Sequence, residues 1–183
     1  MKVGIVGEGA QGQTHLEALN QIEDIEAISI CGAVRSDTEE LAKTWNVSDW
    51  SLEYDSFIQN KQLDAVILCS PNQVHCEQAI KAMKAGLNVL IEIPMGLSLE
   101  ESKNIVEIEK QSGKVCMVGH TQRYSPEFIA IAERIFEGSF TPHHIIQQTY
   151  FFRRKNENRF GKKRSWVDDL LWHQACHMVD MVH

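Results

Sequence analysis

The sequence has no long apolar run and no surplus of positive charge, and each absence excludes a class of function. No apolar stretch approaches the roughly 18 residues that span a bilayer, so we expect no membrane partner. The formal net charge of -7 argues against nucleic acid as a partner, because phosphate backbones attract broadly basic surfaces. Residues 1–9 show no export leader, and we therefore expect a cytoplasmic protein.

Cysteine is also scarce, with five residues in a chain of 183. An odd count gives no complete disulfide framework, and three of the five lie in apolar runs that are typical of buried strands. We therefore expect reduced thiols that pack as small apolar side chains. The five residues are Cys31, Cys69, Cys76, Cys116 and Cys176.

Short β-branched runs alternate with amphipathic stretches over the first two thirds of the chain. Helical patterns include residues 75–85, closed by Gly86, and residues 99–111, opened by a capping box of Ser98 and Glu101. This alternation predicts an α/β fold, a Rossmann doubly wound parallel sheet, over residues 1–121. The apolar runs expected to form its strands are residues 3–6, 25–31, 65–68, 89–91 and 115–118.

After His120 the pattern changes. The sequence predicts a helix over residues 126–137, a strand over residues 144–154, and a helical run over residues 170–182 that has no C-cap signal. We assign residues 122–183 to the start of an α+β substrate domain and expect this domain to be truncated, because one strand alone leaves an unpaired edge. For a truncated domain we predict cofactor binding without efficient turnover. We also expect the exposed strand edge to promote association between copies of the chain.

A glycine-rich loop follows the first apolar run directly. It has the G-x-G-x-x-G spacing, which in a first βαβ unit lets backbone amides approach a pyrophosphate at a helix N-terminus. The flanking strand and helix patterns favour this function over a purely structural glycine turn. The predicted cofactor-binding residues of the loop are Gly7, Gly9, Ala10, Gln11 and Gly12.

The end of the second predicted strand indicates which dinucleotide is bound. An acid there binds the ribose 2′-hydroxyl of NAD, whereas an arginine accepts the 2′-phosphate of NADP. Residues 31–34 contain no acid, and Arg35 and Ser36 follow, which favours NADP as the cofactor. Asp37 is close enough to leave NAD open, and the alternative for Arg35 is an ordinary solvated residue.

Five ordered segments resemble the Gfo/Idh/MocA oxidoreductases. Besides the glycine loop they are residues 69–75, 85–89 and 92–94, and residues 118–120 with Arg123 and Pro126. The resemblance implies an NAD(P)-dependent dehydrogenase whose cofactor cleft is lined by Ser70, Pro71, Asn72, His75, Glu92 and Ile93. Residues 148–156 and 164–177 are similar to the semialdehyde dehydrogenases of aromatic ring cleavage in this family, which implies oxidation of a cyclic hemiacetal carboxylic acid.

Two positions depart from the family pattern. Ile93 stands where the family has a lysine, and His173 stands where it usually has an aspartate one helical turn before the catalytic histidine. Without that lysine the mechanism of the sugar dehydrogenases does not carry over intact, so ordinary polyol substrates are less expected. Ile93 also keeps open a second class of function, a cofactor-binding module without catalysis.

Histidines in the last helical run are the candidate catalytic residues. Removing a hydride from a carbinol carbon needs a base for the hydroxyl proton, and an imidazole suits that role near neutral pH. His173, His177 and Asp180 share one helical stripe, and we predict His177 as the base, with His173 holding a substrate oxygen or tuning its neighbour. The alternative is that one histidine forms only a structural hydrogen bond. A metal site that includes Cys176 is disfavoured, because the run lacks the glutamate of H-E-x-x-H and hydride transfer needs no metal.

Basic residues are concentrated between residues 151 and 164 on an otherwise acidic chain. Arginine forks match carboxylates, so we predict a small-molecule carboxylate as the substrate. The candidate substrate-binding residues are Arg123, Arg153, Arg154 and Arg164, with Trp172 as a wall for a ring. The alternatives are a solvated loop and, for the tryptophan, a place in the core. The sequence leaves homo-oligomer formation open.

Overall fold

The computed structural model describes residues 1–148, 157, 161, 163 and 175–183. The described residues form two compact units. The first contains Met1–Gly119 with residues 157, 161 and 163, and the second contains residues 120–148 and 175–183. The boundary that the sequence analysis places between residues 121 and 122 stays a prediction.

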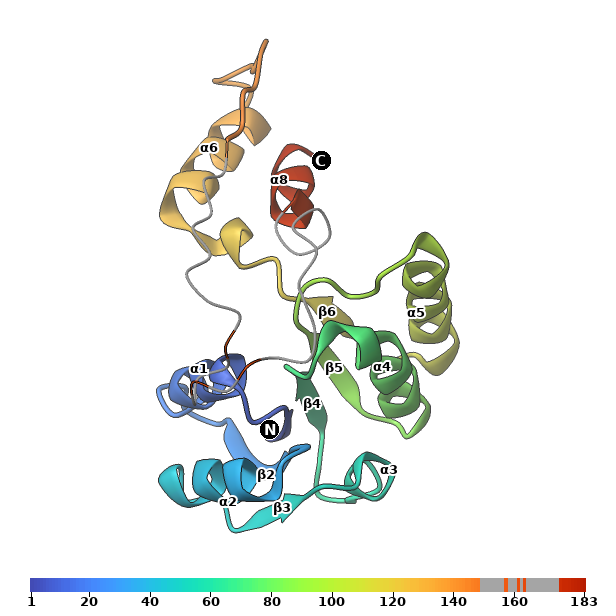
Figure 1. The fold of residues 1–183 in the computed structure, drawn as a ribbon. Coiled ribbons are helices and arrows are strands. Elements are labelled where there is room, and N and C mark those ends of the chain that lie inside the picture. The colour runs from blue at the N-terminus through green and yellow to red at the C-terminus, as the bar shows by residue number, and fades with distance from the viewer. Residues whose placement is uncertain (149–156, 158–160, 162, 164–174) are drawn as a thin grey trace. The chain divides into compact units, whose positions relative to one another are not determined.

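The first unit is built on a six-stranded parallel sheet with the order β3-β2-β1-β4-β5-β6 (Figure 1). The chain starts in the middle of the sheet at β1, adds strands on one side as far as β3, and then returns to the other side of β1 with β4. In open α/β sheets this reversal of strand order creates a crevice at the carboxyl ends of the strands, where ligands bind. The strands are β1 (Lys2–Val6), β2 (Glu26–Cys31), β3 (Asp49–Ser51), β4 (Ala65–Leu68), β5 (Asn88–Ile91) and β6 (Cys116–Val118).

Helices connect the strands and cover both faces of the sheet. Helix α5 begins at the capping box expected from the sequence, where the Ser98 hydroxyl accepts a hydrogen bond from the Glu101 amide. Gly86, at φ +91°, follows α4 and allows the left-handed turn that ends it. The helices of this unit are α1 (Ala10–Leu19), α2 (Arg35–Thr44), α3 (Tyr54–Phe57), the 3₁₀ turn η1 (Asn72–Val74), α4 (His75–Lys84) and α5 (Leu99–Ser112).

Alternate residues of the central strands supply two hydrophobic layers. Ile5 is buried in a cluster with residues of α1 and α2, and its neighbour Val6 is buried in a cluster with residues of α3, α4 and α5. The parallel register continues this alternation across the sheet, because side chains of a strand point to opposite faces in turn. Ile5 pairs with Ile30 and Ile67, and Val6 pairs with Cys31 and Leu68.

The predicted Rossmann fold is confirmed, and two short elements were missed. Strand β3 has three residues, of which only Trp50 is apolar, and α3 has four, so neither shows a hydrophobic period in the sequence. None of the five cysteines, all of which are described, forms a disulfide bond. Burial, helped by nearby carboxylates, raises the pKa of Cys31 to about 12 and that of Cys116 to about 11, so both remain protonated at neutral pH.

The second unit contains η2 (Thr121–Tyr124), α6 (Pro126–Phe136) and α8 (Ala175–Val182). Helix α6 and its stop at Gly138 agree with the sequence prediction. The strand expected over residues 144–154 is wrong for its first five residues, since residues 144–148 have no regular structure and are mostly exposed. Strand formation needs a ladder of backbone hydrogen bonds to a neighbouring strand, and residues 144–148 belong to none of the strands in the described part of the chain. No helix in the described part of the chain is long and apolar enough to cross a membrane.

Candidate functional site

The glycine loop between β1 and α1 has the geometry of a phosphate cradle. Gly7 lies at φ +118°, and a Cβ there would lie 2.6 Å from the Cys69 carbonyl oxygen. A Cβ on Gly12 would lie 2.1 Å from the Gly7 carbonyl oxygen, whereas a Cβ on Gly9 would meet no atom within 4 Å. The first and third glycines therefore permit close backbone packing, and the second leaves open space beside the start of α1. A pyrophosphate fits this arrangement, since α1 begins at Ala10 without a side-chain cap.

The loop after β4 supplies a second edge of the crevice. Asn72 begins η1 and is 8% exposed, and its Oδ1 atom is buried with no hydrogen-bond partner in the described residues. A buried amide oxygen without a partner is costly unless a ligand or water satisfies it. Asn72 is thus a candidate for a ligand contact, next to the half-buried Ser70 and Pro71.

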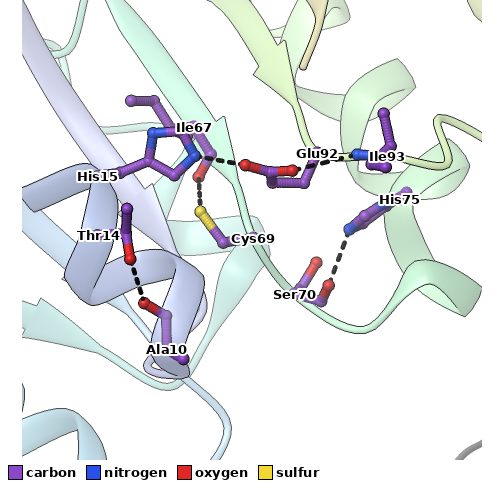
Figure 2. Close-up of polar contacts among 9 residues, drawn as sticks. All are labelled: Ala10, Thr14, His15, Ile67, Cys69, Ser70, His75, Glu92 and Ile93. Atoms are coloured by element: carbon purple, nitrogen blue, oxygen red, sulfur yellow. Dashed lines mark hydrogen bonds and ion pairs between the residues drawn. The ribbon is translucent and has the colours of Figure 1, made fainter. Parts of the chain in front are cut away.

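A polar contact between α1 and the end of β5 was missed in the sequence analysis (Figure 2). His15 Nε2 lies 2.7 Å from Glu92 Oε1, and the Ile93 amide donates to Glu92 Oε2 at 3.3 Å. The side chains of His15 and Glu92 are only 20% and 12% exposed. Because β4 lies between β1 and β5, this contact crosses the carboxyl end of the sheet beside the point where strand order reverses. The signal was present in the sequence, since His15 follows Gly12 by about one helical turn.

The environment of Glu92 keeps its carboxylate charged. Burial alone would raise the pKa of this group, but the hydrogen bond and charge of His15, the Ile93 amide and the charge of His75 outweigh it. The net effect is a pKa below the ordinary value, so Glu92 presents a fixed negative charge at the crevice.

His75 supports the loops of the crevice from behind. Its ring is 2% exposed, with Nδ1 2.8 Å from the Pro94 carbonyl oxygen and Nε2 2.8 Å from the Ser70 carbonyl oxygen (the latter drawn in Figure 2). Both ring nitrogens thus face backbone carbonyls in the interior, and the predicted place of His75 at the cofactor stays a prediction. Ile93 is also buried, at 8% exposure, which leaves its backbone as the part that could meet a ligand.

The start of α2 carries the residues expected to select the cofactor. Arg35 and Ser36 are exposed in the first turn of the helix. The Arg35 guanidinium lies 5.2 Å from the centre of the Trp50 ring, a cation–π arrangement, and the Ser36 hydroxyl donates to Asp37 Oδ1 at 2.9 Å. Both residues therefore lie at the carboxyl end of β2. In this fold, the ribose of the adenosine half of the dinucleotide binds there.

The second unit gathers the other candidate residues around Asp180 in α8. Arg123 donates to this carboxylate through Nε at 2.6 Å and Nη2 at 2.5 Å, and His120 Nε2 lies 3.8 Å from it. The ring of His177 lies edge-on to that of His120, with centroids 6.0 Å apart. The hydrogen bonds from Arg123, reinforced by nearby positive charge, hold the pKa of Asp180 below its usual value although burial opposes this. Arg123 is thus engaged by an internal carboxylate, and its predicted contact with substrate stays a prediction.

The remaining predicted residues lie outside the described part of the chain. They are the catalytic candidate His173 and the substrate-binding candidates Arg153, Arg154, Arg164 and Trp172. Within the described residues, no group of three or more His, Cys, Asp or Glu side chains is arranged to hold a metal ion. The sequence analysis gave no role to His15, and it used His120 only as part of the segment 118–120 that resembles the family.

The fold and the crevice define a dinucleotide-binding domain of the Rossmann class, and sequence comparison identifies its family. Residues 1–120 match the Gfo/Idh/MocA oxidoreductase family model, described as an NAD-binding Rossmann fold. Residues 126–183 match the model of the C-terminal region of bacterial oxidoreductases. The chain belongs to the Gfo/Idh/MocA oxidoreductase family, whose members found by the comparison are NAD(P)-dependent dehydrogenases.

Two individual proteins and one solved structure show how similar this chain is to characterised members of the family. The chain is 39% identical over 181 residues to the 4-carboxy-2-hydroxymuconate-6-semialdehyde dehydrogenase of Sphingobium sp., covering 99% of this chain and 58% of that protein. It is 28% identical over 139 residues to the scyllo-inositol 2-dehydrogenase (NAD(+)) of Bacillus subtilis, covering 75% and 41%. A crystal structure of myo-inositol 2-dehydrogenase from Lactobacillus plantarum superposes with a TM-score of 0.71 at 26% identity, covering 76% and 42%. The chain thus spans about half the length of the relatives that it matches.

Proposed function

We propose that this protein is an oxidoreductase that transfers a hydride to NADP⁺ from a hydroxy carboxylic acid or from a semialdehyde carboxylic acid in its cyclic hemiacetal form. The observation that carries the proposal is the 39% identity, over 99% of the chain, to a protein named as a semialdehyde dehydrogenase. The glycine loop and the crevice at the end of β1 and β4 supply a place for the dinucleotide. When bound, the nicotinamide accepts the hydride, and the protein supplies binding, orientation and proton transfer.

The first unit would hold the cofactor. Gly7, Gly9 and Gly12, with Ala10 and Gln11, would approach the pyrophosphate through backbone amides. Arg35 and Ser36 at the start of α2 support NADP as the proposed cofactor, while NAD stays the alternative. Further residues proposed to face the cofactor are Ser70, Pro71, Asn72, Glu92 and the backbone of Ile93.

The second unit would supply the proton acceptor. We assign His177 as the base that takes the substrate hydroxyl proton while the hydride leaves. The lowered pKa of Asp180 keeps that carboxylate charged at neutral pH, and its charge interacts with His177 one helical turn away. A negative neighbour favours the imidazolium that forms once His177 has accepted the proton, so Asp180 would act as a positioning residue.

The substrate would be a small carboxylate. Arg153, Arg154, Arg164 and Trp172 stay proposed contacts on the strength of the sequence pattern, and His173 a proposed partner of a substrate oxygen. Arg123 would stabilise Asp180 and contribute to substrate binding only through its remaining donors. We propose a cytoplasmic enzyme, with homo-oligomer formation left to measurement by sedimentation.

A cofactor-binding module without catalysis is the second candidate. It is favoured by one observation, the buried Ile93 at the position where the family carries a lysine. The two candidates share the cofactor site and differ in turnover alone.

The test is an assay of the purified protein with its natural C-terminus, with NADP⁺ or NAD⁺ and a semialdehyde carboxylic acid, following the absorbance of the reduced nicotinamide. We expect turnover that falls about 100-fold or more in His177→Ala, in line with the usual contribution of general base catalysis. Cofactor affinity should be unchanged in that variant. Tight cofactor binding without turnover on any such acid would favour the module instead.

A further inference from the structure

The second strand lacks the acid that usually contacts the cofactor ribose, yet the structure places an acid there from another part of the chain. Glu8, in the glycine loop, extends to the end of β2, where its Oε1 atom accepts hydrogen bonds from two consecutive amides. The Ala33 amide donates at 3.1 Å and the Val34 amide at 2.9 Å. Residues 32–34, which follow β2, contain no acid of their own. The carboxylate of Glu8 therefore occupies the position where sequence reasoning looks for an aspartate or glutamate on β2 itself.

Local chemistry explains why Glu8 takes this position. Helix α2 begins at Arg35, with Val34 as its N-cap and no side-chain cap hydrogen bond. The amides at a helix N-terminus lack partners within the helix and carry partial positive charge, so a carboxylate is favoured there. Gly32 leaves room beside the carboxylate, since a Cβ on it would lie 3.0 Å from Glu8 Oε2, although the closer atom is Thr38 Oγ1 at 2.0 Å.

The same amides would suit a ribose phosphate. A 2′-phosphate at the end of β2 needs donors from the start of α2, and Glu8 already accepts from two of them with an anionic group. Arg35, which would attract the phosphate, stacks on Trp50 and belongs to the same turn. At the start of α2, Arg35 would therefore favour a 2′-phosphate, and Glu8, which reaches this point from the glycine loop, would oppose one.

We propose that Glu8 is the residue that discriminates between a ribose 2′-hydroxyl and a ribose 2′-phosphate in this protein. A hydroxyl donates to the carboxylate and leaves it in place, whereas a phosphate meets a like charge and must displace the carboxylate from the Ala33 and Val34 amides. Glu8 consequently weakens the preference for NADP that Arg35 creates. This inference rests on the proposed cofactor site and specifies how that site selects its ligand.

The experiment measures the dissociation constants of NADPH and NADH by fluorescence for the wild-type protein and three variants. Glu8→Gln removes the charge and keeps the side-chain length. Glu39→Gln, an exposed change on α2, is the control for net charge, and Arg35→Gln is the control for the opposing residue. We expect Glu8→Gln to raise the affinity for NADPH relative to NADH about tenfold, equivalent to about 1.4 kcal/mol. Glu39→Gln should leave the ratio unchanged, and Arg35→Gln should lower it.

Binding of both cofactors with an unchanged ratio in Glu8→Gln would overturn the role of Glu8 and leave the proposed function intact. Binding of neither cofactor to the wild-type protein would refute the proposed function and this inference together. A second measurement tests the proposal without any variant, in case Glu8→Gln fails to fold. In the wild-type protein, 2′,5′-ADP should shift the amide NMR signals of Ala33 and Val34 more than 5′-ADP does, and equal shifts would contradict the displacement of Glu8.

Discussion

At the scale of single residues, the three glycines of the cofactor loop have different physical roles. Gly12 is required by packing, since any Cβ there would collide with the backbone of Gly7. Gly9 has φ −76°, which other residues adopt freely, and open space where a Cβ would be. The fold therefore does not require a glycine at position 9, and the proposed ligand gives the reason for one.

This contrast predicts different effects for two matched substitutions. Gly12→Ala should destabilise the first unit by about 1–3 kcal/mol, the usual cost of overpacking. Gly9→Ala should leave the free energy of unfolding almost unchanged and weaken dinucleotide binding, because the methyl group takes the space that a pyrophosphate needs. Urea denaturation and cofactor fluorescence measure the two effects separately. Equal loss of stability in both variants would show that Gly9 is structural as well.

Glu92 gives a prediction on pH. Its pKa is lower in the folded protein than the ordinary value of 4.5, so the unfolded chain binds the proton more tightly. The stabilisation from Glu92 is therefore fully present above pH 4.5 and is lost as the pH falls through the lowered folded value. Glu92→Gln should cost about 1–3 kcal/mol at neutral pH, the typical cost of losing a hydrogen bond to a buried charged group. The difference from wild type should shrink on acidification.

The comparison variant is His15→Ala. Without the His15 hydrogen bond, burial is the main effect on Glu92 and raises its pKa, so Glu92 should no longer lose stabilisation on acidification, and the loss of stability in acid should be smaller than in the wild-type protein. Urea denaturation at a series of pH values measures these curves. Superimposable curves for the wild-type protein and His15→Ala would contradict the proposed link between the two side chains.

At the scale of elements, two helices begin at a serine whose surroundings differ. Ser98 caps α5 through the Glu101 amide at 3.1 Å, and Glu101 in turn accepts from the Leu97 amide at 2.6 Å. Ser125 is the N-cap of α6 by backbone position, but its hydroxyl makes no cap hydrogen bond and is buried without a partner in the described residues. The same residue type therefore stabilises one helix start and not the other.

Substitution of each serine by alanine tests this difference. Ser98→Ala should lower the free energy of unfolding by about 1 kcal/mol, the typical value of an N-cap. Ser125→Ala should cost nothing measurable, because it removes a hydroxyl that has no partner to lose. Chemical denaturation monitored by circular dichroism compares the two. A larger loss in Ser125→Ala than in Ser98→Ala would refute this account of the caps.

At the scale of the whole molecule, the buried hydrophobic residues within the described part of the chain belong to the first unit. Both clusters are made from the sheet and from helices α1 to α5, and neither α6 nor α8 contains a buried residue. Helix α6 instead exposes Phe136, at 94%, and Ile131, at 46%. Burial of apolar surface is the main source of stability, so the two units should differ in their resistance to local unfolding.

Hydrogen exchange measured by mass spectrometry tests this difference. Amides of β1, β4 and β5 should exchange slowest, and those of α6 and α8 should exchange faster by orders of magnitude, since they open without breaking either hydrophobic cluster. Addition of the cofactor should slow exchange in the glycine loop and the start of α2. Protection of α6 equal to that of β1 would show that the second unit is stabilised as strongly as the first.

The sequence by itself determined the Rossmann fold, the positions of five of the six strands of its sheet, the capping box of α5 and the glycine loop. These features depend on local hydrophobic periods, on turn residues and on a motif with fixed spacing, all of which can be read along the chain. Only the tertiary structure decided the contacts of Glu8 with the end of β2, of His15 with Glu92, and of Arg123 with Asp180. Each joins residues at least 25 positions apart, and nothing in the local pattern of either partner specifies the other. The strand expected from residue 144 onward did not form in its described part for a related reason, because a strand depends on a pairing partner that its own sequence does not contain.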